Sequence, residues 1–222
     1  MMLSKKFSAL GAKFSKSEER GLTLIDMDYK KVLSLGISTC GFAEIRMAQS
    51  SKKIRVIATT IDREGLIFTK KLIKEFGLQN QVAAKLEDLK EEMPYKKNEF
   101  DFIYARLVLH YLDNENLDIA LEEMKRVLKK KGRCFVVVKS EKNRIGKEFS
   151  YDPVSKLTTF DSHYGKYSRY LHTRKSIANH LEKAGFKILS IKEYKEYLYS
   201  GYMREKISKR ASDLIEVVCQ KI

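Results

Sequence analysis

The sequence predicts a single α/β domain built on a doubly wound, mostly parallel β-sheet with helices on both faces. Short apolar runs, of the length of buried strands, alternate along the chain with segments in which apolar residues recur at helical spacing. Strands that are apolar throughout are typical of a parallel sheet covered on both faces. No repeat and no Gly- or Pro-rich linker divides the 222 residues, which contain 11 Gly and 2 Pro. One folded domain is therefore expected.

The first part of the chain contains four apolar runs of strand length. They are residues 32–35, 56–61, 102–105 and 134–138. Helices are expected at residues 42–49 and 64–76, where apolar residues recur at helical spacing. A third helix carries one apolar stripe at positions i, i+4, i+7 and i+11, made by Leu117, Leu121, Met124 and Leu128. Gly132 is expected to end this helix, because glycine accepts the left-handed turn that follows a helix.

The C-terminal part is predicted to add one helix and two strands. The helix, at residues 174–184, begins after Thr173, which suits a helix N-cap, and Gly185 ends it. The strands are predicted at residues 187–191 and 214–218. The polar, tyrosine-rich segment between them, which contains KEYKEYLYSGYMREK, is expected to be helical or irregular.

The composition indicates a folded protein with a strongly basic balance. Hydrophobic residues make up 43% of the chain, which excludes a disordered or collagen-like protein. The 44 Lys and Arg residues exceed the 29 Asp and Glu residues, for a net charge of +15. Concentrated on one face, this excess would attract RNA or another polyanion. Spread over helix surfaces, it would form an ordinary solvated surface.

The sequence favours a cytoplasmic location without a membrane partner. No apolar stretch reaches the roughly 18 residues that a membrane-spanning helix needs. Lys13 interrupts what would be the apolar part of a secretory signal, although the serines and the lack of acids in this basic segment also fit organelle targeting. Cys40, Cys134 and Cys219 are odd in number and lack metal-ligand spacing, so neither a disulfide framework nor a metal site is expected. Nothing in the sequence indicates an oligomeric state.

The turn after the first predicted strand, Leu-Gly-Ile-Ser-Thr-Cys-Gly at residues 35–41, is the expected ligand loop. In an open parallel sheet, ligands bind beyond the carboxyl ends of the strands. Small residues there let a ligand lie against the backbone, and the following helix N-terminus presents N–H groups. The loop does not fit G-x-G-x-x-G, which disfavours a nicotinamide cofactor.

Two acids follow later strands. Asp62 comes directly after the second strand, where the 2′-hydroxyl of a ribose would present a hydrogen-bond donor. Asp62 equally suits the N-cap of the helix that begins near Glu64, and one carboxylate can do both jobs. Asp88 lies where another strand gives way to a turn. Both acids are therefore candidates for binding a nucleoside.

Four blocks, taken in order, resemble the class I S-adenosylmethionine-dependent methyltransferases, particularly their broad small-molecule type. The blocks are VLSLGISTCGFAE, TTIDREGL, EDLKEEMPYKKNEFDFIYARLVLHYL and EEMKRVLKKKGRCFVVV. The helix that runs into LEKAGF, residues 181–186, is similar to that type's last helix. The resemblance covers about residues 30–220, and the order of the blocks is more specific than any single block. It implies a Rossmann-like fold with a seven-stranded sheet and S-adenosyl-L-methionine as the cofactor.

The resemblance also implies which residues bind the cofactor. The loop after the first strand would lie under its methionine and ribose parts, and the acid after the second strand would bind the ribose. The acid after the third strand and the residue that follows it would flank the adenine, while the end of the next strand would lie beside the methionine. The expected residues are Gly36, Ile37, Ser38, Gly41, Asp62, Arg63, Asp88, Leu89, Ala105 and Arg106.

Three residues depart from the family's pattern. Ser34 stands where the first strand often carries an acid, and Ser38 and Cys40 replace the second and third glycines of the loop. The loss of the acid removes a hydrogen-bond acceptor near the methionine amino group, and a cysteine side chain needs room that the family leaves empty. The Ser-Thr-x-Gly form of the loop resembles one found in some RNA methyltransferases. These departures motivate two alternatives, an RNA methyltransferase and a catalytically inactive, methyltransferase-like binding protein.

Methyl transfer from a sulfonium needs no metal, so an enzyme of this kind mainly holds the nucleophile and the methyl group in line. His110, just after the strand at residues 102–105, is a candidate general base, although a packed histidine at the start of a helix explains it equally. Arg106 is expected to face the pocket and bind a carboxylate or phosphate. Its alternative is a surface ion pair with Asp113 or a neighbouring acid.

Substrate choice is expected to lie in residues 139–172, which depart most from the common core. Tyrosines alternate there with lysines and arginines, a pattern that suits stacking on a base beside a phosphate, or binding of an aromatic or acidic metabolite. The candidate substrate-binding residues are Tyr151, Tyr164, Tyr167 and Tyr170. A lid that only closes over the cofactor is the alternative.

The sequence thus predicts a single domain in four parts, with residues 1–29 as a basic, helical extension and 30–139 as the cofactor-binding core. Residues 140–172 form a substrate-side insertion or lid, and 173–222 a C-terminal helix and strands. The chain lacks the Asn/Asp-Pro-Pro-aromatic motif of DNA-base methylation and the lysine and acid set of ribose 2′-O-methylation. A small-molecule methyl acceptor is therefore favoured over RNA.

Overall fold

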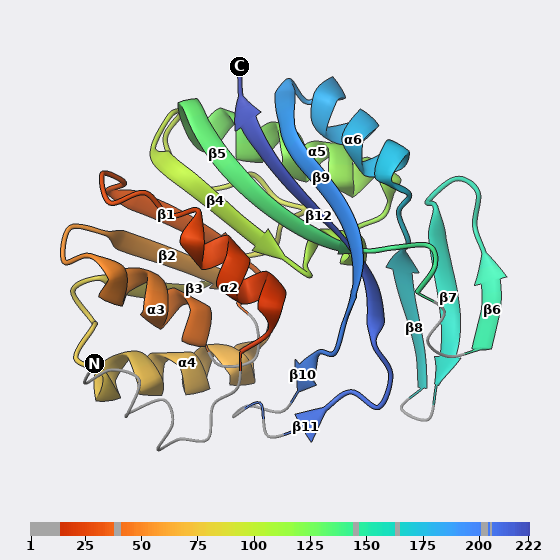
Figure 1. The fold of residues 1–222 in the computed structure, drawn as a ribbon, viewed down its shortest axis with the longest axis horizontal. Coiled ribbons are helices and arrows are strands. Elements are labelled where there is room, and N and C mark those ends of the chain that lie inside the picture. The colour runs from red at the N-terminus through yellow and green to blue at the C-terminus, as the bar shows by residue number, and fades with distance from the viewer. Residues whose placement is uncertain (1–13, 38–40, 144–146, 163–164, 201–203, 205) are drawn as a thin grey trace.

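The computed structural model describes residues 14–37, 41–143, 147–162, 165–200, 204 and 206–222. Its centre is a seven-stranded sheet in the order β3-β2-β1-β4-β5-β12-β9, in which only β12 runs antiparallel to its neighbours (Figure 1). The strands are β1 (Lys31–Leu35), β2 (Arg55–Thr60), β3 (Val82–Leu86), β4 (Phe100–Arg106), β5 (Leu128–Lys139), β9 (Phe186–Glu196) and β12 (Ser212–Lys221). The predicted fold class is confirmed.

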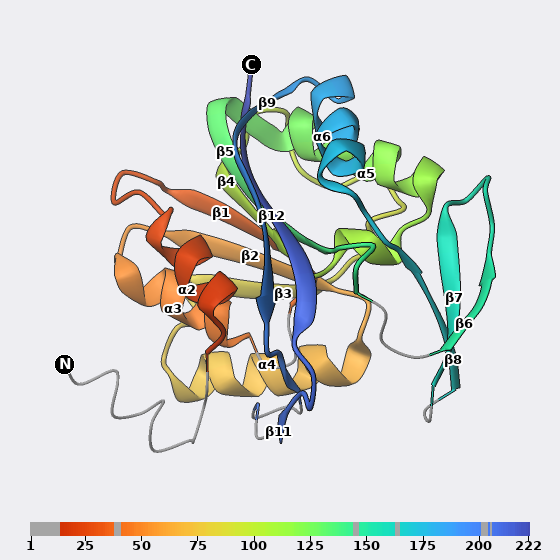
Figure 2. The same cartoon turned by 45° about the vertical axis from the view of Figure 1, so that its right-hand side comes forward.

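Helices cover both faces of this sheet (Figures 1 and 2). One face carries α2 (Lys16–Thr23), α3 (Phe42–Ser50) and α4 (Arg63–Glu75), and the other carries α5 (Asn114–Val127) and α6 (Arg174–Lys183). Successive residues of a strand point to opposite faces, so Val32 and Leu33 enter different hydrophobic cores, both fully buried. Burial on both faces is the reason that the central strands are apolar throughout.

The helix predicted to end at Gly132 ends at Val127, and β5 begins at the next residue. The backbone N–H groups of Asn98 and Glu99 donate to the carbonyls of Arg126 and Val127, which ties the end of α5 to the start of β4. Lys131, with a φ of 61°, takes the left-handed conformation instead of Gly132. Glycine is needed at 132 for space, because a Cβ there would lie 2.8 Å from the Leu128 side chain.

The described residues of the tyrosine-rich segment are extended or irregular and form no helix, so the predicted helical alternative is wrong for them. Strand β9 continues to Glu196, and a short ladder of β10 (Tyr199–Ser200) and β11 (Lys206–Ile207) follows. Alternate side chains of β9 face α2: the guanidinium carbon of Arg20 lies 4.4 Å from the centroid of the Tyr194 ring, and Glu196 accepts from the Ser17 backbone at 3.0 Å. The polar residues therefore follow a period of two, which also suits a strand beside a polar helix face.

The segment between β5 and α6 folds as a separate antiparallel sheet at the side of the main one (Figure 1). Its strands are β6 (Lys147–Tyr151), β7 (Leu157–Ser162) and β8 (Gly165–Tyr170), and we call it the inserted sheet. An isolated bridge between Ser140 and His172 joins its base to the end of β5. Within the described ranges, no helix is long and apolar enough to cross a membrane.

Candidate active site

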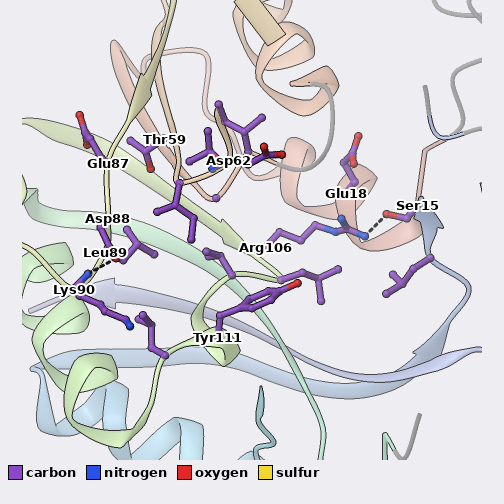
Figure 3. A pocket seen from close by; sticks show the side chains of 18 of the residues that line it. Ser15, Glu18, Thr59, Asp62, Glu87, Asp88, Leu89, Lys90, Arg106 and Tyr111 are labelled. Carbon is purple, nitrogen blue, oxygen red and sulfur yellow. Dashed lines mark hydrogen bonds between the residues drawn. The ribbon is translucent and has the colours of Figure 1, made fainter. Parts of the chain in front are cut away.

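A cavity of about 590 Å³ opens beyond the carboxyl ends of β1, β2, β3 and β4. The loop after each of these strands contributes to its lining, as expected for an open α/β sheet. Helix α2 and the segment around β10 complete the wall. Figure 3 shows Asp88 and Lys90 at one end of the cavity and Glu18 and Ser15 at the other, with Asp62 between them.

The turn after β1 brings backbone against the loop after β4. Gly36 has a φ of 70°, and a Cβ there would lie 2.5 Å from Val108 Cγ2. The backbone N–H of Ile37 donates to the carbonyl of Thr59 at 2.8 Å, so the turn is fixed to β2 as well. Both Gly36 and Ile37 line the cavity, which leaves bare backbone on its floor.

The later residues of the expected loop are placed differently. Gly41 starts α3 with a φ of 64°, and a Cβ there would meet Thr69 of α4 at 2.5 Å. Gly41 is therefore required for packing between α3 and α4 and does not line the cavity. Ser38 and Cys40, the two departures within the loop, lie outside the described residues.

Asp62 occupies the N-cap position of α4, but its carboxylate makes no capping hydrogen bond within the described part of the chain. Its own backbone N–H donates to Thr60 Oγ1 at 3.0 Å, which fixes the residue at the end of β2. The exposed carboxylate lines the cavity, so it is available to a ligand. Arg63 begins α4 beside it but is not part of the lining.

The loop after β3 places a second acid on the same cavity. The Glu87 backbone N–H donates to the Thr60 carbonyl at 3.0 Å, which holds this loop beside the end of β2. Asp88 accepts from the Lys90 backbone at 3.0 Å, and Leu89 is buried in the wall behind it. The Tyr95 hydroxyl donates to both Glu87 oxygens, at 2.7 and 2.8 Å. Burial, followed by this contact with Glu87, raises the pKa of Tyr95 well above its usual value.

Arg106, the last residue of β4, lies in the lining with 7% of its surface exposed. Its Nε donates to Ser17 Oγ at 2.7 Å, and a terminal nitrogen donates to Ser15 Oγ (Figure 3). The surface ion pair with Asp113 is not formed, because Asp113 caps α5 by accepting from the Asn116 backbone at 2.8 Å. Ala105 is fully buried in the core and does not reach the cavity.

Several lining residues were not expected from the sequence. Glu18 of α2 is 1% exposed and forms an ion pair with Arg204 at 2.7 Å. Tyr111 enters from the short 3₁₀ helix η1 (Leu109–Tyr111), and Leu198 comes from the segment before β10. Glu18 and Arg204 are 186 residues apart in sequence, so no local pattern predicts their contact. The local sequence marks Glu18 only in that it forms, with Glu19, a pair of acids in the first turn of a basic segment.

A carboxyl group does lie beside Ser34, although the strand itself lacks one. The Ser34 hydroxyl donates to Glu44 Oε1 at 2.6 Å, and Glu44 comes from the first turn of α3. Glu44 is 1% exposed, and burial raises its pKa above the usual value. Neither Ser34 nor Glu44 belongs to the described lining of the cavity, so this carboxyl group is a buried partner of Ser34.

His110 lies in η1, is 1% exposed, and is absent from the cavity lining. Its ring stacks on Tyr111 with centroids 4.8 Å apart. Burial, and then the positive charges of Arg169 and Lys139, lower its pKa well below the usual value. This environment matches the packed histidine that the sequence left as an alternative to a general base.

The three described tyrosines among these candidates, Tyr151, Tyr167 and Tyr170, do not line the cavity. Tyr151 is exposed on β6, and Tyr170 is buried against α6, where its hydroxyl lies 3.1 Å from His180 Nε2. Tyr167 stacks on Phe160 with centroids 5.4 Å apart. Tyr164 lies outside the described residues. Arg169, which shares one face of β8 with Tyr167, is the residue of this strand that contacts η1, because its guanidinium carbon lies 3.8 Å from the centroid of the Tyr111 ring.

Residues 33–136 match a family model described as a methyltransferase domain. No curated protein matches the chain. Among solved structures, a Methanosarcina mazei protein described as an S-adenosylmethionine-dependent methyltransferase is 15% identical, with a TM-score of 0.68 over 90% of this chain and 95% of that one. The [4+2]-cyclase SpnF is 17% identical, with a TM-score of 0.66 over 92% of this chain and 79% of that one.

A third similar structure comes from work on the conversion of a disulfide bond into a thioacetal group during echinomycin biosynthesis. It is 13% identical, with a TM-score of 0.67 over 96% of this chain and 83% of that one. At these identities the three structures show a shared fold. The family model adds a match in sequence that covers β1 to β5, which is the part of the chain that builds the cavity floor.

Proposed function

We propose that the chain is a class I S-adenosylmethionine-dependent methyltransferase that transfers a methyl group from S-adenosyl-L-methionine to a small-molecule acceptor. The observation that supports this best is the order of polar groups along one cavity. Asp88 lies at one end, Asp62 in the middle, and Glu18 with Arg106 at the other end (Figure 3). This order matches an extended ligand with a base, a ribose and an amino acid.

The residues present fit this cofactor. The uncapped Asp62 carboxylate would accept from the ribose hydroxyls, and Asp88 with the Leu89 backbone would flank the adenine. Gly36 lines the cavity and carries no side chain of its own, so its backbone would lie beside the chain between ribose and sulfur. At the far end, the Glu18 carboxylate suits an ammonium group and Arg106 suits a carboxylate.

The bound cofactor would supply an electrophilic methyl group on a sulfonium. The protein then has to align the acceptor with that group and exclude water, and alignment of this kind contributes up to about 7 to 11 kcal/mol. Arg106 bridges the cavity to α2 through two serine hydroxyls, so α2 closes the cavity on that side. No histidine occurs among the described lining residues, so positioning, rather than proton transfer by His110, is the contribution we assign.

A small acceptor is favoured by the enclosure of the cavity between α2, η1 and the segment around β10. The fold also occurs in a protein described by a step of echinomycin biosynthesis. RNA is the second candidate, motivated by the net charge of +15. Filter binding across a salt series separates the two acceptors, because each phosphate contact with RNA adds to a steep salt dependence.

Calorimetric titration with S-adenosylmethionine tests the proposal. We expect the wild-type protein to bind it and Asp62→Ala to bind at least about tenfold more weakly, since a hydrogen bond to a charged group contributes about 1.5 to 3 kcal/mol. Asp28→Ala, an exposed acid outside the lining, is the matched control and is expected to bind normally. Absence of heat from the wild-type protein at millimolar cofactor would contradict the proposal.

A further inference from the structure

A positive charge is held at the mouth of the cavity where η1 meets the inserted sheet. The guanidinium carbon of Arg169, from β8, lies 3.8 Å from the centroid of the Tyr111 ring. Tyr111 lines the cavity and is 54% exposed, so the arginine lies over a ring that is also accessible to a ligand. A guanidinium on an aromatic face is fixed in orientation while its N–H groups stay free to donate.

A second cation approaches the same place from the main sheet. Lys139 is the last residue of β5, and the Arg106 position of β4 pairs with Val137 of β5, so the two cations end neighbouring strands. The His172 backbone N–H donates to the Lys139 carbonyl at 3.0 Å, which fixes the end of β8 beside the end of β5. Arg106 lines the cavity, whereas Lys139 and Arg169 lie outside its described lining, beside β4 and η1, and we call the three residues the cation cluster.

The members of the cation cluster lack acidic partners. Within the described ranges, none of the three forms an ion pair, and their hydrogen-bond acceptors are neutral. Arg106 donates to Ser15 and Ser17, Lys139 to Ser212 at 2.7 Å, and Arg169 to the Ser168 carbonyl at 2.8 Å. Arg20 and Arg126, by contrast, each form an ion pair, with Glu216 at 2.7 Å and with Glu123 at 2.6 Å.

Three cations brought together without acids destabilise one another. Burial, and then the positive charges of Arg169 and Arg106, lower the pKa of Lys139 to about 8, with Asp213 acting in the opposite direction. Partly buried charges are normally compensated by a partner of opposite sign. An anion placed between Lys139 and Arg169 would supply that compensation.

We propose that the methyl acceptor is an anionic small molecule, whose carboxylate or phosphate binds between Arg169 and Lys139 while its carbon skeleton packs against Tyr111. The inference rests on the proposed function, since it places the acceptor next to the cofactor cavity. It assigns the inserted sheet a direct part in acceptor binding, through Arg169 of β8 in place of the tyrosines expected from the sequence.

The test uses the full chain saturated with S-adenosylhomocysteine and three probes that share one ring. Benzoate carries a carboxylate, phenyl phosphate carries a phosphate, and benzamide is neutral. We expect at least one anion to bind at least about tenfold more tightly than benzamide. The tighter of the two anions identifies the acceptor's group as carboxylate or phosphate.

Two variants assign the binding to the cation cluster. Arg169→Gln and Lys139→Met are each expected to weaken the anion by about tenfold, because each removes one charge-assisted hydrogen bond. Both are expected to leave the affinity for S-adenosylhomocysteine unchanged. Arg133→Gln, an exposed arginine near the other end of β5, is the matched control and is expected to change neither affinity.

Equal affinities for the anions and benzamide, or no binding by any probe to the loaded protein, would overturn the inference. Anion binding that is unchanged in Arg169→Gln would also overturn the inference. Of the two variants, Arg169→Gln is the less prone to misfold, because the residue lies on the inserted sheet. Failure of S-adenosylhomocysteine itself to bind would instead contradict the proposed function, so the two failures are distinguishable.

Discussion

Gly36 meets two requirements that no other residue type satisfies together. Its φ of 70° lies in the left-handed region, where a Cβ is disfavoured, and the loop after β4 approaches so closely that a Cβ would lie 2.5 Å from Val108. Gly77 shares the first requirement, with a φ of 67°, but has nothing within 4 Å of the Cβ position. Alanine substitutions at Gly36 and Gly77 therefore separate the free-energy cost of the left-handed conformation from that of the contact with Val108.

Gly36→Ala is expected to lower the free energy of unfolding by about 1 to 3 kcal/mol more than Gly77→Ala, because overpacking a tight contact adds that much to the conformational cost. The displaced turn should also weaken S-adenosylmethionine binding in Gly36→Ala alone. Denaturant unfolding and calorimetry measure the two effects. Equal losses of stability in the two variants, with cofactor affinity intact, would show that the contact with Val108 has no role.

Some site residues follow from the sequence and others do not. Asp62 and Asp88 could be predicted because each comes directly after a strand, and the carboxyl ends of neighbouring parallel strands meet at one edge. Glu18 could not, because its partner Arg204 lies near the other end of the chain. His110 was ambiguous in the sequence, since a residue next to a strand end can enter the core as readily as the cavity.

At the scale of elements, the join between the inserted sheet and the main sheet depends on a buried histidine. His172 is fully buried, its ring stacks on Tyr170 with centroids 4.0 Å apart, and its Nδ1 lies 3.2 Å from Ser176 Oγ. Its Nε2 has no hydrogen-bond partner among the described residues. Burial, and then the charge of His180, lower the pKa of His172 to about 3.

This shift makes the fold sensitive to acid. In the unfolded chain His172 binds a proton near its usual pKa of about 6.5, whereas in the folded chain it stays neutral down to about pH 3. Between these two pH values the unfolded state therefore binds more protons than the folded state. The contribution of neutral His172 to the free energy of unfolding is complete above pH 6.5 and is lost as the pH falls. The slope is about 1.4 kcal/mol per pH unit.

His172→Asn is expected to remove this dependence, since asparagine keeps a polar atom near Ser176 but does not titrate. Urea unfolding of both proteins at pH 7 and pH 5 measures it. The wild-type protein should lose about 2 kcal/mol more than the variant between these two pH values. Parallel losses in the two proteins would show that His172 is protonated in the folded state.

The element boundaries show where local pattern is overruled by tertiary contacts. The strands were predictable because the main sheet buries both of their faces. The end of α5 was not, because the strand pairing that begins at Leu128 competes with a helical stripe that includes the same residue. The end of β9 shows no apolar period at helical spacing, and its side chains bond to Ser17 and Glu216 in distant elements.

At the scale of the whole molecule, the cavity is closed by parts from both ends of the chain. Ser17 bonds to Glu196, Arg20 to Glu216 and Glu18 to Arg204, across separations of 179, 196 and 186 residues. The floor of the cavity, by contrast, comes from the contiguous segment that matches the family model. The floor of the cavity was therefore predictable from sequence, while the closing wall required the folded chain.

A crystal structure of the protein with S-adenosylhomocysteine would show whether the cavity binds an adenosyl group. We expect the ribose hydroxyls within hydrogen-bond distance of Asp62, the adenine beside Asp88 and Leu89, and the amino acid end toward Glu18 and Arg106. An adenosyl group bound elsewhere, or bound in this cavity with no contact to Asp62, would contradict this expectation.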